Sequence, residues 1–352
     1  MQHAAAIIVL VLALAGTAGS AEGPGAPQDE LVIAAVGDVM LGHRAEPFLE
    51  REGPDYPYAS VLPVLQQAQI VVGNLEFPIS VRGTAAENKK FTLRAGPVAV
   101  ESLKAAGIRV VTLANNHILD FGPQALQDTL KALAENGILF TGAGMNLEDA
   151  RAPALLRAGD RTIAFLAYSL TFPIEFYASP GRPGTAPGYR EYVKADIEKV
   201  RPKADLVVVS FHWGAELMTQ AKEYQQELGR RAVDWGADLV LGHHPHVLQE
   251  LEVYRGRLIA YSLGNFVFGS ESDRTNSSII LLCTFKGKNL IRAEAVPLDV
   301  NNYRVAYRPR VLTDGQAEKV IEELAAGSRK RGTEIQFRHG RGIIDLPGDP
   351  RN

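Results

Sequence analysis

The sequence predicts an α/β fold in which helices pack on buried β-sheets. Six short apolar runs rich in Val and Ile have the composition of strands that are buried on both faces. Segments with helical spacing of apolar residues lie between several of these runs, at residues 97–107, 121–137 and 219–237. Alternation of strands and helices is typical of α/β proteins with helices packed on their sheets.

Each apolar run ends in polar residues. In chain order the six runs are LVIAAVGDVML (31–41), AQIVVGNLEFPIS (68–80), GIRVVTLANNHILDFG (107–122), DLVVVSFHWGAE (205–216), DLVLGHHPHV (238–247) and LIAYSLGNFVFG (258–269). In open α/β sheets, ligands bind in the crevice at the carboxyl ends of the strands. The polar side chains at these ends are therefore expected to converge on one site, although they are far apart in the sequence.

The groups at these strand ends suit a metal centre. Two carboxylates, one amide and three imidazoles form a set without thiolate that suits Zn, Mn or Fe. Six groups exceed the three or four that one zinc ion needs, and they match two ions bridged by one carboxylate. Taken singly, each has an ordinary explanation such as a turn or a helix cap, but several strand ends together favour a site. The expected ligands are Asp38, Glu76, Asn116, His212, His244 and His246, with His243 pointing away.

The motifs GDVMLG, GNLEFPIS, LANNHILDFG, HWGAE, GHHPHV and SLGNFVF resemble those of the capsule-synthesis CapA family, also called PGA_cap. That family falls in the calcineurin-like metallophosphoesterase superfamily and is tied to poly-γ-glutamate capsule production. The resemblance covers residues 31–272. It implies a four-layer α/β/β/α sandwich of the metallophosphoesterase type, in which two sheets pack face to face between outer helices.

The resemblance also implies two divalent metal ions, with Glu76 in the position of the bridging carboxylate. In the superfamily, a histidine stands two residues after the first aspartate of the metal site. Asp38 matches that aspartate, and this chain has Met40 where the histidine is expected. The nearest histidine is His43. One ion would therefore lack a ligand unless His43 or water supplies it.

The catalytic prediction centres on His117, which directly follows Asn116. Because Asn116 already supplies a ligand from this loop, His117 is free to act as a general acid. Asp120 could orient the His117 ring, or it could cap the following helix. The predicted function is a metal-dependent hydrolase or transferase acting on a phosphoester or a γ-glutamyl amide. The alternative is a non-catalytic capsule accessory protein that binds polyglutamate and retains a degenerate metal site.

Substrate recognition is predicted for a cationic segment, residues 87–97, and for the last of the six strands. The segment holds Lys89, Lys90 and Arg94. Of these, Lys90 and Arg94 are the residues predicted to bind carboxylates of poly-γ-glutamate or a related envelope polymer, although such charges are usually solvated. Asn265 is expected to help shape the pocket. Capsule-synthesis membrane proteins are possible partners. The net charge of −3, without a long block of one sign, argues against nucleic acid.

The two ends of the chain differ from the middle in composition. Residues 1–21 have the apolar run and small-residue end of a secretory signal, which predicts a secreted or periplasmic protein, with an N-terminal membrane anchor as the alternative. Residues 22–30 read as a flexible lead-in. One domain is predicted over 31–330, with strands and a helix in 273–330 completing it, and a loosely ordered tail over 331–352. Cys283 is the only cysteine and lies in an apolar run, which predicts a buried, inert thiol.

Overall fold

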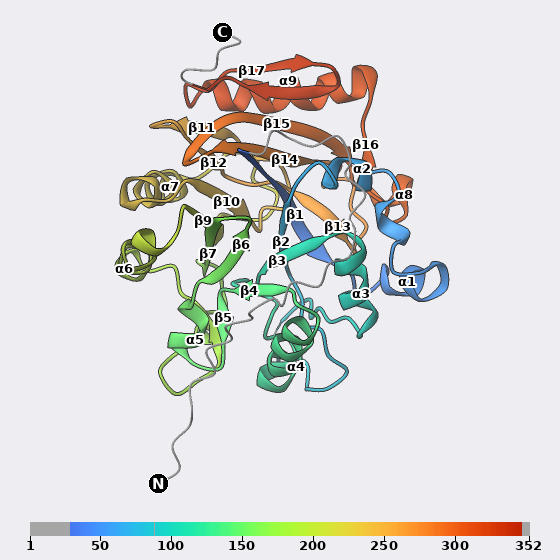
Figure 1. The fold of residues 1–352 in the computed structure, drawn as a ribbon. Helices are drawn as coiled ribbons and strands as arrows, with labels where there is room; N and C mark the ends of the chain where they lie inside the picture. Colours follow the sequence, from blue (N-terminus) through green and yellow to red (C-terminus); the bar gives the residue numbers. More distant parts are fainter. Residues whose placement is uncertain (1–28, 88, 347–352) are drawn as a thin grey trace.

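The computed structural model describes residues 29–87 and 89–346, and it contains two large β-sheets (Figure 1). The predicted signal segment and most of the lead-in lie outside the described residues. The first sheet has the order β17-β18-β15-β14-β1-β2-β3-β4, with β13 paired to β1 and β16 to β15. Its strands are β1 (Glu30–Met40), β2 (Ile70–Leu75), β3 (Ile108–Thr112), β4 (Leu139–Thr141), β13 (Asn265–Phe268), β14 (Ser277–Lys286), β15 (Asn289–Asp299), β16 (Arg310–Val311), β17 (Ile335–Arg338) and β18 (Arg341–Ile344).

The second sheet has the order β11-β12-β10-β9-β7-β6. Its strands are β6 (Ala154–Ala158), β7 (Arg161–Ser169), β9 (Leu206–His212), β10 (Leu239–His243), β11 (Leu251–Tyr254) and β12 (Arg257–Ala260). Within this sheet, β7, β9, β10 and β12 run parallel to one another. In the first sheet, β13, β1, β2, β3 and β4 are also parallel neighbours. A small third sheet pairs β5 (Ala143–Gly144) with β8 (Gly184–Thr185).

Helices cover the outer faces of the two sheets. In Figure 1, α6 and α7 lie on the left and α1 and α3 on the right, with the sheets between them. The α-helices are α1 (Glu46–Glu52), α2 (Leu62–Leu65), α3 (Val98–Ala105), α4 (Gly122–Glu135), α5 (Leu147–Arg151), α6 (Arg190–Val200), α7 (Glu223–Trp235), α8 (Asn302–Val305) and α9 (Asp314–Arg329). Short 3₁₀ helices span η1 (Tyr56–Tyr58), η2 (Ile174–Phe176) and η3 (Arg201–Lys203).

The core confirms the predicted four-layer α/β/β/α order. Alternate residues of a strand point to opposite faces of its sheet. On β1, Ile33 belongs to the apolar cluster between the two sheets, which also contains Phe165 of β7. Its neighbour Val32 packs instead into the cluster under α1, α3 and α4. A third cluster joins the outer face of the second sheet to α6 and α7. The thiol of Cys283 is buried between the sheets, as predicted, and burial raises its pKa above the usual range.

The prediction of a loosely ordered tail over 331–352 is wrong for residues 335–344. These residues form the β17–β18 hairpin, which extends the first sheet through β15. Ile335, Ile344 and Leu346 are buried together with the apolar face of α9. Two strands of four residues each are too short to give a periodic signal, and the contacts that order them come from helix α9 and strand β15. The predicted strand pair and helix within 273–330 are present as β14, β15 and α9.

Within residues 29–87 and 89–346, no helix is long and apolar enough to cross a membrane.

Candidate metal centre

Asp38 and Glu76 stand at the carboxyl ends of two adjacent parallel strands of the first sheet. Asp38 lies near the end of β1 and Glu76 directly follows β2, and both side chains are fully buried. Gly37 allows the chain before β13 to approach, because a Cβ atom at this position would lie 1.9 Å from the carbonyl oxygen of Gly264. The amide of Asp38 donates to that same oxygen at 2.9 Å. This close approach fixes the direction of Asp38 and brings Asn265 beside it.

The histidines come from the second sheet and face these carboxylates. His212 is the last residue of β9, and His244 and His246 follow β10. His244 and His246 have positive φ angles of 95° and 59°, a left-handed backbone that is uncommon for non-glycine residues and concentrates at functional sites. The ring centroids of His212 and His244 are 4.7 Å apart. The ring centroids of His244 and His246 are 6.0 Å apart. The loop after β10 thus places two imidazoles near the imidazole at the end of β9.

Five of the six predicted ligands form two groups that share Glu76. In the group Glu76, His212 and His244, and in the group Asp38, Glu76 and His246, the candidate ligand atoms lie within 4.8 Å of one another. A third such group combines His244 and His246 with the exposed Glu216, which the sequence analysis does not single out. Asn116 joins the cluster through its Oδ1, which lies 2.7 Å from Nε2 of His212.

Two of the predicted ligands have a buried polar atom without a hydrogen-bond partner among the described residues. These atoms are Oε1 of Glu76 and Nδ1 of His244. Oε1 of Glu76 lies 3.5 Å from Nε2 of His212 and 3.8 Å from Nε2 of His246. An unsatisfied buried carboxylate oxygen is costly unless something binds it. The donor set and these orphaned atoms therefore fit divalent metal ions.

His246 is held by contacts to one of its two ring nitrogens. Its Nδ1 lies 2.9 Å from Oδ1 of Asn265 and 3.2 Å from Oδ2 of Asp38, which leaves Nε2 on the side of Glu76. Ligating histidines commonly use one nitrogen for the metal and donate the other N–H to an oxygen. Asn265, predicted to shape the substrate pocket, therefore lies against His246 and is placed to orient it.

His243 does not point away from the site as predicted. Its ring is buried, and Nδ1 lies 3.2 Å from Oδ1 of Asp38, in a contact that does not have hydrogen-bond geometry. β10 pairs with β9 as far as His243, which lies opposite His212, so the strand ends next to Asp38. Asp38 is consequently surrounded by His243, His246 and the backbone amide of His244, which donates to Oδ2 at 3.2 Å.

Burial and neighbouring charges shift the ionisation of the cluster in opposite directions. Burial and the charge of Asp38 raise the pKa of Glu76 well above its usual range. Burial also lowers the pKa of His212 well below its usual value and, with the nearby His246, lowers the pKa of His244 to about 3. Burial works against the protonated form of His246 too, but Glu76 and Asp38 outweigh it and raise the pKa to about 10. Neutral imidazole is the form that binds metal, so His212 and His244 are already in the ligand state near neutral pH.

Asn74 connects the ligands of the first sheet, and the sequence analysis does not identify it. Its Nδ2 donates to Oδ1 of Asp38 at 2.9 Å, and its Oδ1 accepts a hydrogen bond from Nδ2 of Asn115 at 3.2 Å. Oδ1 of Asn115 in turn accepts from the amides of His117 and Ile118 at 3.1 and 2.9 Å. This local turn presents Asn116 and His117 to the site. A buried amide within the apolar run at residues 70–75 is the signal that could have revealed it.

His117 and Asp120 form a close pair. Nδ1 of His117 lies 2.6 Å from Oδ2 of Asp120, which also accepts from the amide of Leu93 at 2.7 Å. Helix α4 begins at Gly122 after Phe121, and no described side chain caps it, so the alternative role of Asp120 as a helix cap is wrong. Burial lowers the pKa of His117, although Asp120 opposes the shift.

Lys89 contacts the His117–Asp120 pair, whereas Lys90 and Arg94 do not contact the candidate metal ligands. The ammonium group of Lys89 contacts the carbonyl oxygen of Asn116 and Oδ1 of Asp120, and it lies 3.2 Å from Nδ1 of His117. Lys90 is exposed, with its ammonium 5.1 Å from the ring centroid of Phe91. The guanidinium of Arg94 lies 4.0 Å from the ring centroid of Phe121. Substrate binding by Lys90 and Arg94 stays a prediction.

Met40 and His43 do not provide the ligand that the first motif lacks. The side chain of Met40 is buried in the apolar cluster of the first sheet and approaches Gly269. His43 is exposed and is not a member of any of the three candidate ligand groups. Within the part of the chain that the structure describes, neither residue therefore replaces the histidine that the first motif lacks.

The fold and the cluster define a class of protein. It is an α/β/β/α sandwich with a buried site of histidines and carboxylates that come from both sheets. Residues 32–270 match the family described as bacterial capsule synthesis protein PGA_cap, and the chain belongs to this family. It is 35% identical over 328 residues to the PGA biosynthesis protein CapA of Bacillus subtilis (strain 168), covering 91% of this chain and 86% of that protein. It is 34% identical over 279 residues to the capsule biosynthesis protein CapA of Bacillus anthracis, covering 77% and 68%.

Among solved structures, a 5′-nucleotidase precursor from Thermus thermophilus is similar with a TM-score of 0.47 and 13% sequence identity, covering 84% of this chain and 58% of that chain.

Proposed function

We propose that this protein acts in poly-γ-glutamate capsule synthesis or processing as a metal-dependent hydrolase or transferase with a dinuclear site. Its family and the names of its relatives support the role in capsule synthesis. The main support for this chemistry is Glu76, which two groups of candidate ligands share and whose buried Oε1 has no hydrogen-bond partner among the described residues. A carboxylate in that position suits a bridge between two ions. Mn, Zn or Fe fits the donors.

Bound ions would supply a nucleophilic hydroxide and stabilise negative charge on the substrate. The chain's own residues would hold the ions, orient a ligand and donate a proton. Asp38, Glu76, Asn116, His212, His244 and His246 would hold the ions, and Asn265 would orient His246 through Nδ1. His117 would protonate the leaving group from Nε2, because Nδ1 is engaged by Asp120 at 2.6 Å. Lys89 would fix Asp120 from the other side.

The proposed roles of Asn116 and His117 separate in two variants. In His117→Ala, metal content should stay at the wild-type level while turnover of a γ-linked glutamate oligomer falls by roughly 10²–10⁴-fold, the usual contribution of a positioned acid. Asn116→Ala should lose metal instead, and part of its activity should return when metal is added. Metal analysis and product quantification by mass spectrometry measure both effects. Equal metal loss in the two variants would make His117 a ligand.

A non-catalytic accessory protein that binds polyglutamate is the second candidate. It is favoured by the histidine that the first motif lacks, since Met40 is buried in the core and His43 is exposed. Wild-type protein that carries metal and binds the oligomer, but turns over neither the oligomer nor an activated phosphodiester, would establish this candidate over the first.

A further inference from the structure

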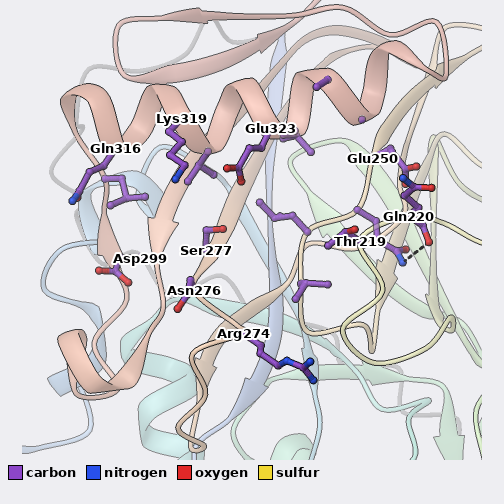
Figure 2. A pocket seen from close by; sticks show the side chains of 18 of the residues that line it. Thr219, Gln220, Glu250, Arg274, Asn276, Ser277, Asp299, Gln316, Lys319 and Glu323 are labelled. Carbon is purple, nitrogen blue, oxygen red and sulfur yellow. Dashed lines mark hydrogen bonds between the residues drawn. The ribbon is translucent and has the colours of Figure 1, made fainter.

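A cavity separate from the histidine cluster lies beneath helix α9 (Figure 2). Its volume is about 820 Å³, which is in the range of pockets that bind small molecules or chain segments. Helix α9, the start of β14 and the loops after β9 and β10 line it. No candidate metal ligand is among its lining residues.

The cavity carries cations that are not neutralised. Arg274, Lys319 and Lys330 line it, and within residues 29–87 and 89–346 none of them has a carboxylate oxygen within 4.0 Å. Two of the acids in the lining are already paired: Asp299 with Arg304 and Arg310, and Glu250 with Arg331. Glu323 is the remaining acid. Figure 2 shows Lys319 extending from α9 into the space, with Arg274 on the opposite side. The surplus charge favours an anionic ligand.

The neutral part of the lining indicates which kind of anion. The side chains of Thr219, Gln220, Ser277 and Gln316 make no hydrogen bonds to other described residues, so their hydroxyl and amide groups can pair with amide bonds of a ligand. Apolar residues supply a surface for methylene groups: Val247, Leu248, Leu312, Val320 and Leu324. Separate cations, amide-pairing groups and apolar contacts together match an amide-linked chain of carboxylates better than they match a compact anion such as phosphate.

The cavity adjoins the metal centre through two loops. Residues 247–250 directly follow His246, and Thr219 and Gln220 follow the loop of Glu216. These loops are joined by hydrogen bonds from Nε2 of Gln249 to the carbonyl oxygens of Met218 and Gln220, at 2.8 and 3.3 Å. A chain bound in the cavity would therefore lie along the loop that carries His244 and His246 and along the loop that carries Glu216.

We infer that this cavity binds a segment of an acidic, amide-linked chain and holds the polymer beside the metal centre. The identification of that chain as γ-linked polyglutamate rests on the proposed function. The cationic residues that make the site, Arg274, Lys319 and Lys330, lie beyond the family match at residues 32–270. The cations of the site thus come from this chain's C-terminal part, whereas residues 219–220 and 247–250 of its lining lie within the match.

The test measures binding apart from catalysis. The full protein, in the presence of a chelator, is titrated into a fluorescein-labelled γ-linked glutamate decamer while anisotropy is recorded. Arg274→Glu with Lys319→Glu should weaken binding by roughly tenfold or more, because two attractive charges become repulsive. The matched control is Lys286→Glu with Lys288→Glu, which reverses two exposed lysines in the hairpin turn at the other end of β14. It should stay within about twofold of wild type.

Unlabelled decamer should displace the probe, whereas inorganic phosphate at the same concentration of charges should not. Wild-type-like binding by the Arg274/Lys319 variant, equal loss in the control, displacement by phosphate as strong as by the decamer, or no binding by wild type would each overturn the inference. Turnover by His244→Ala with His246→Ala is measured in parallel. If that variant keeps wild-type turnover while the cavity variant loses binding, the proposed function fails and the cavity stands. If the cavity variant binds normally while the histidine variant loses turnover, the cavity inference fails and the proposed function stands.

Discussion

Lys89 reaches the His117–Asp120 pair from a segment whose other cations lie elsewhere. Its side chain is 16% exposed, and that of Asp120 is 0% exposed. Burial lowers the pKa of Lys89, while Asp120 opposes the shift. Because Oδ1 and Oδ2 of Asp120 serve Lys89 and His117 respectively, the lysine fixes the carboxylate that holds the imidazole. Lys89 is therefore a positioning residue rather than a group that reacts.

Replacing Lys89 by Met should disturb the orientation of His117 without removing metal. We expect kcat to fall by about tenfold to a hundredfold with KM little changed, and Lys89→Arg to recover part of the loss, because it restores a donor to Asp120. Lys90→Met is the matched control, since the neighbouring lysine is exposed, and it should behave like wild type. A large rise in KM with unchanged kcat in Lys89→Met would instead indicate substrate binding.

Metal affinity should rise with pH because ligands must lose protons to bind. The pKa of His246 is raised to about 10 by Glu76 and Asp38, so at neutral pH the metal-free site holds a proton that metal must displace. Below that pKa, each proton released gives up to about tenfold tighter binding per pH unit. Competition with a calibrated chelator at pH 6.5, 7.5 and 8.5 measures the slope. An affinity independent of pH over this range would contradict the assigned ionisation.

The predicted ligands could be found in the sequence because each stands at the end of an apolar strand. Asn74 and Lys89 could not be found in the same way. Asn74 lies within a strand rather than after its end, so the strand-end pattern does not select it, although it donates to Asp38. Lys89 lies in an irregular segment, where no periodicity states which of two adjacent lysines turns inward. Only the packing of the loop against residues 116–120 distinguishes Lys89 from Lys90.

At the scale of elements, the β17–β18 hairpin is the part that the sequence does not predict. Its residues pair with β15 and pack against α9, and these contacts form only when the rest of the first sheet exists. The parallel strands are predicted because their apolar runs are long and end in recognisable turns. Local pattern thus defines the central strands, whereas tertiary contact defines the edge.

Adjacent isoleucines of β18 test whether this edge is a stabilising part of the core. Ile344 is fully buried among residues of both sheets, whereas Ile343 is half-buried. Ile344→Ala should lower the free energy of unfolding by about 2–5 kcal/mol, as is usual for a buried Ile. Ile343→Ala removes the same atoms and should cost clearly less. Urea unfolding measures both, and equal small losses would mean that the hairpin contributes little.

At the scale of the whole molecule, the candidate metal centre joins the two sheets. Asp38 and Glu76 come from the first sheet, and His212, His244 and His246 come from the second. Behind them, the two sheets share one apolar cluster, which fixes the distance between the strand ends. Metal that binds only the folded chain stabilises it, so chelation should lower the melting temperature as well as any activity.

Whether these residues form one metal centre can be measured as the metal content of the purified protein. Purified protein is loaded with Mn, Zn or Fe, dialysed, and analysed by mass spectrometry beside His244→Ala with His246→Ala. We expect close to two ions per wild-type chain, the loss of most of that metal in the variant, and a lower melting temperature for the variant. Metal content in the variant equal to that of wild type, or no metal in wild type, would contradict this expectation.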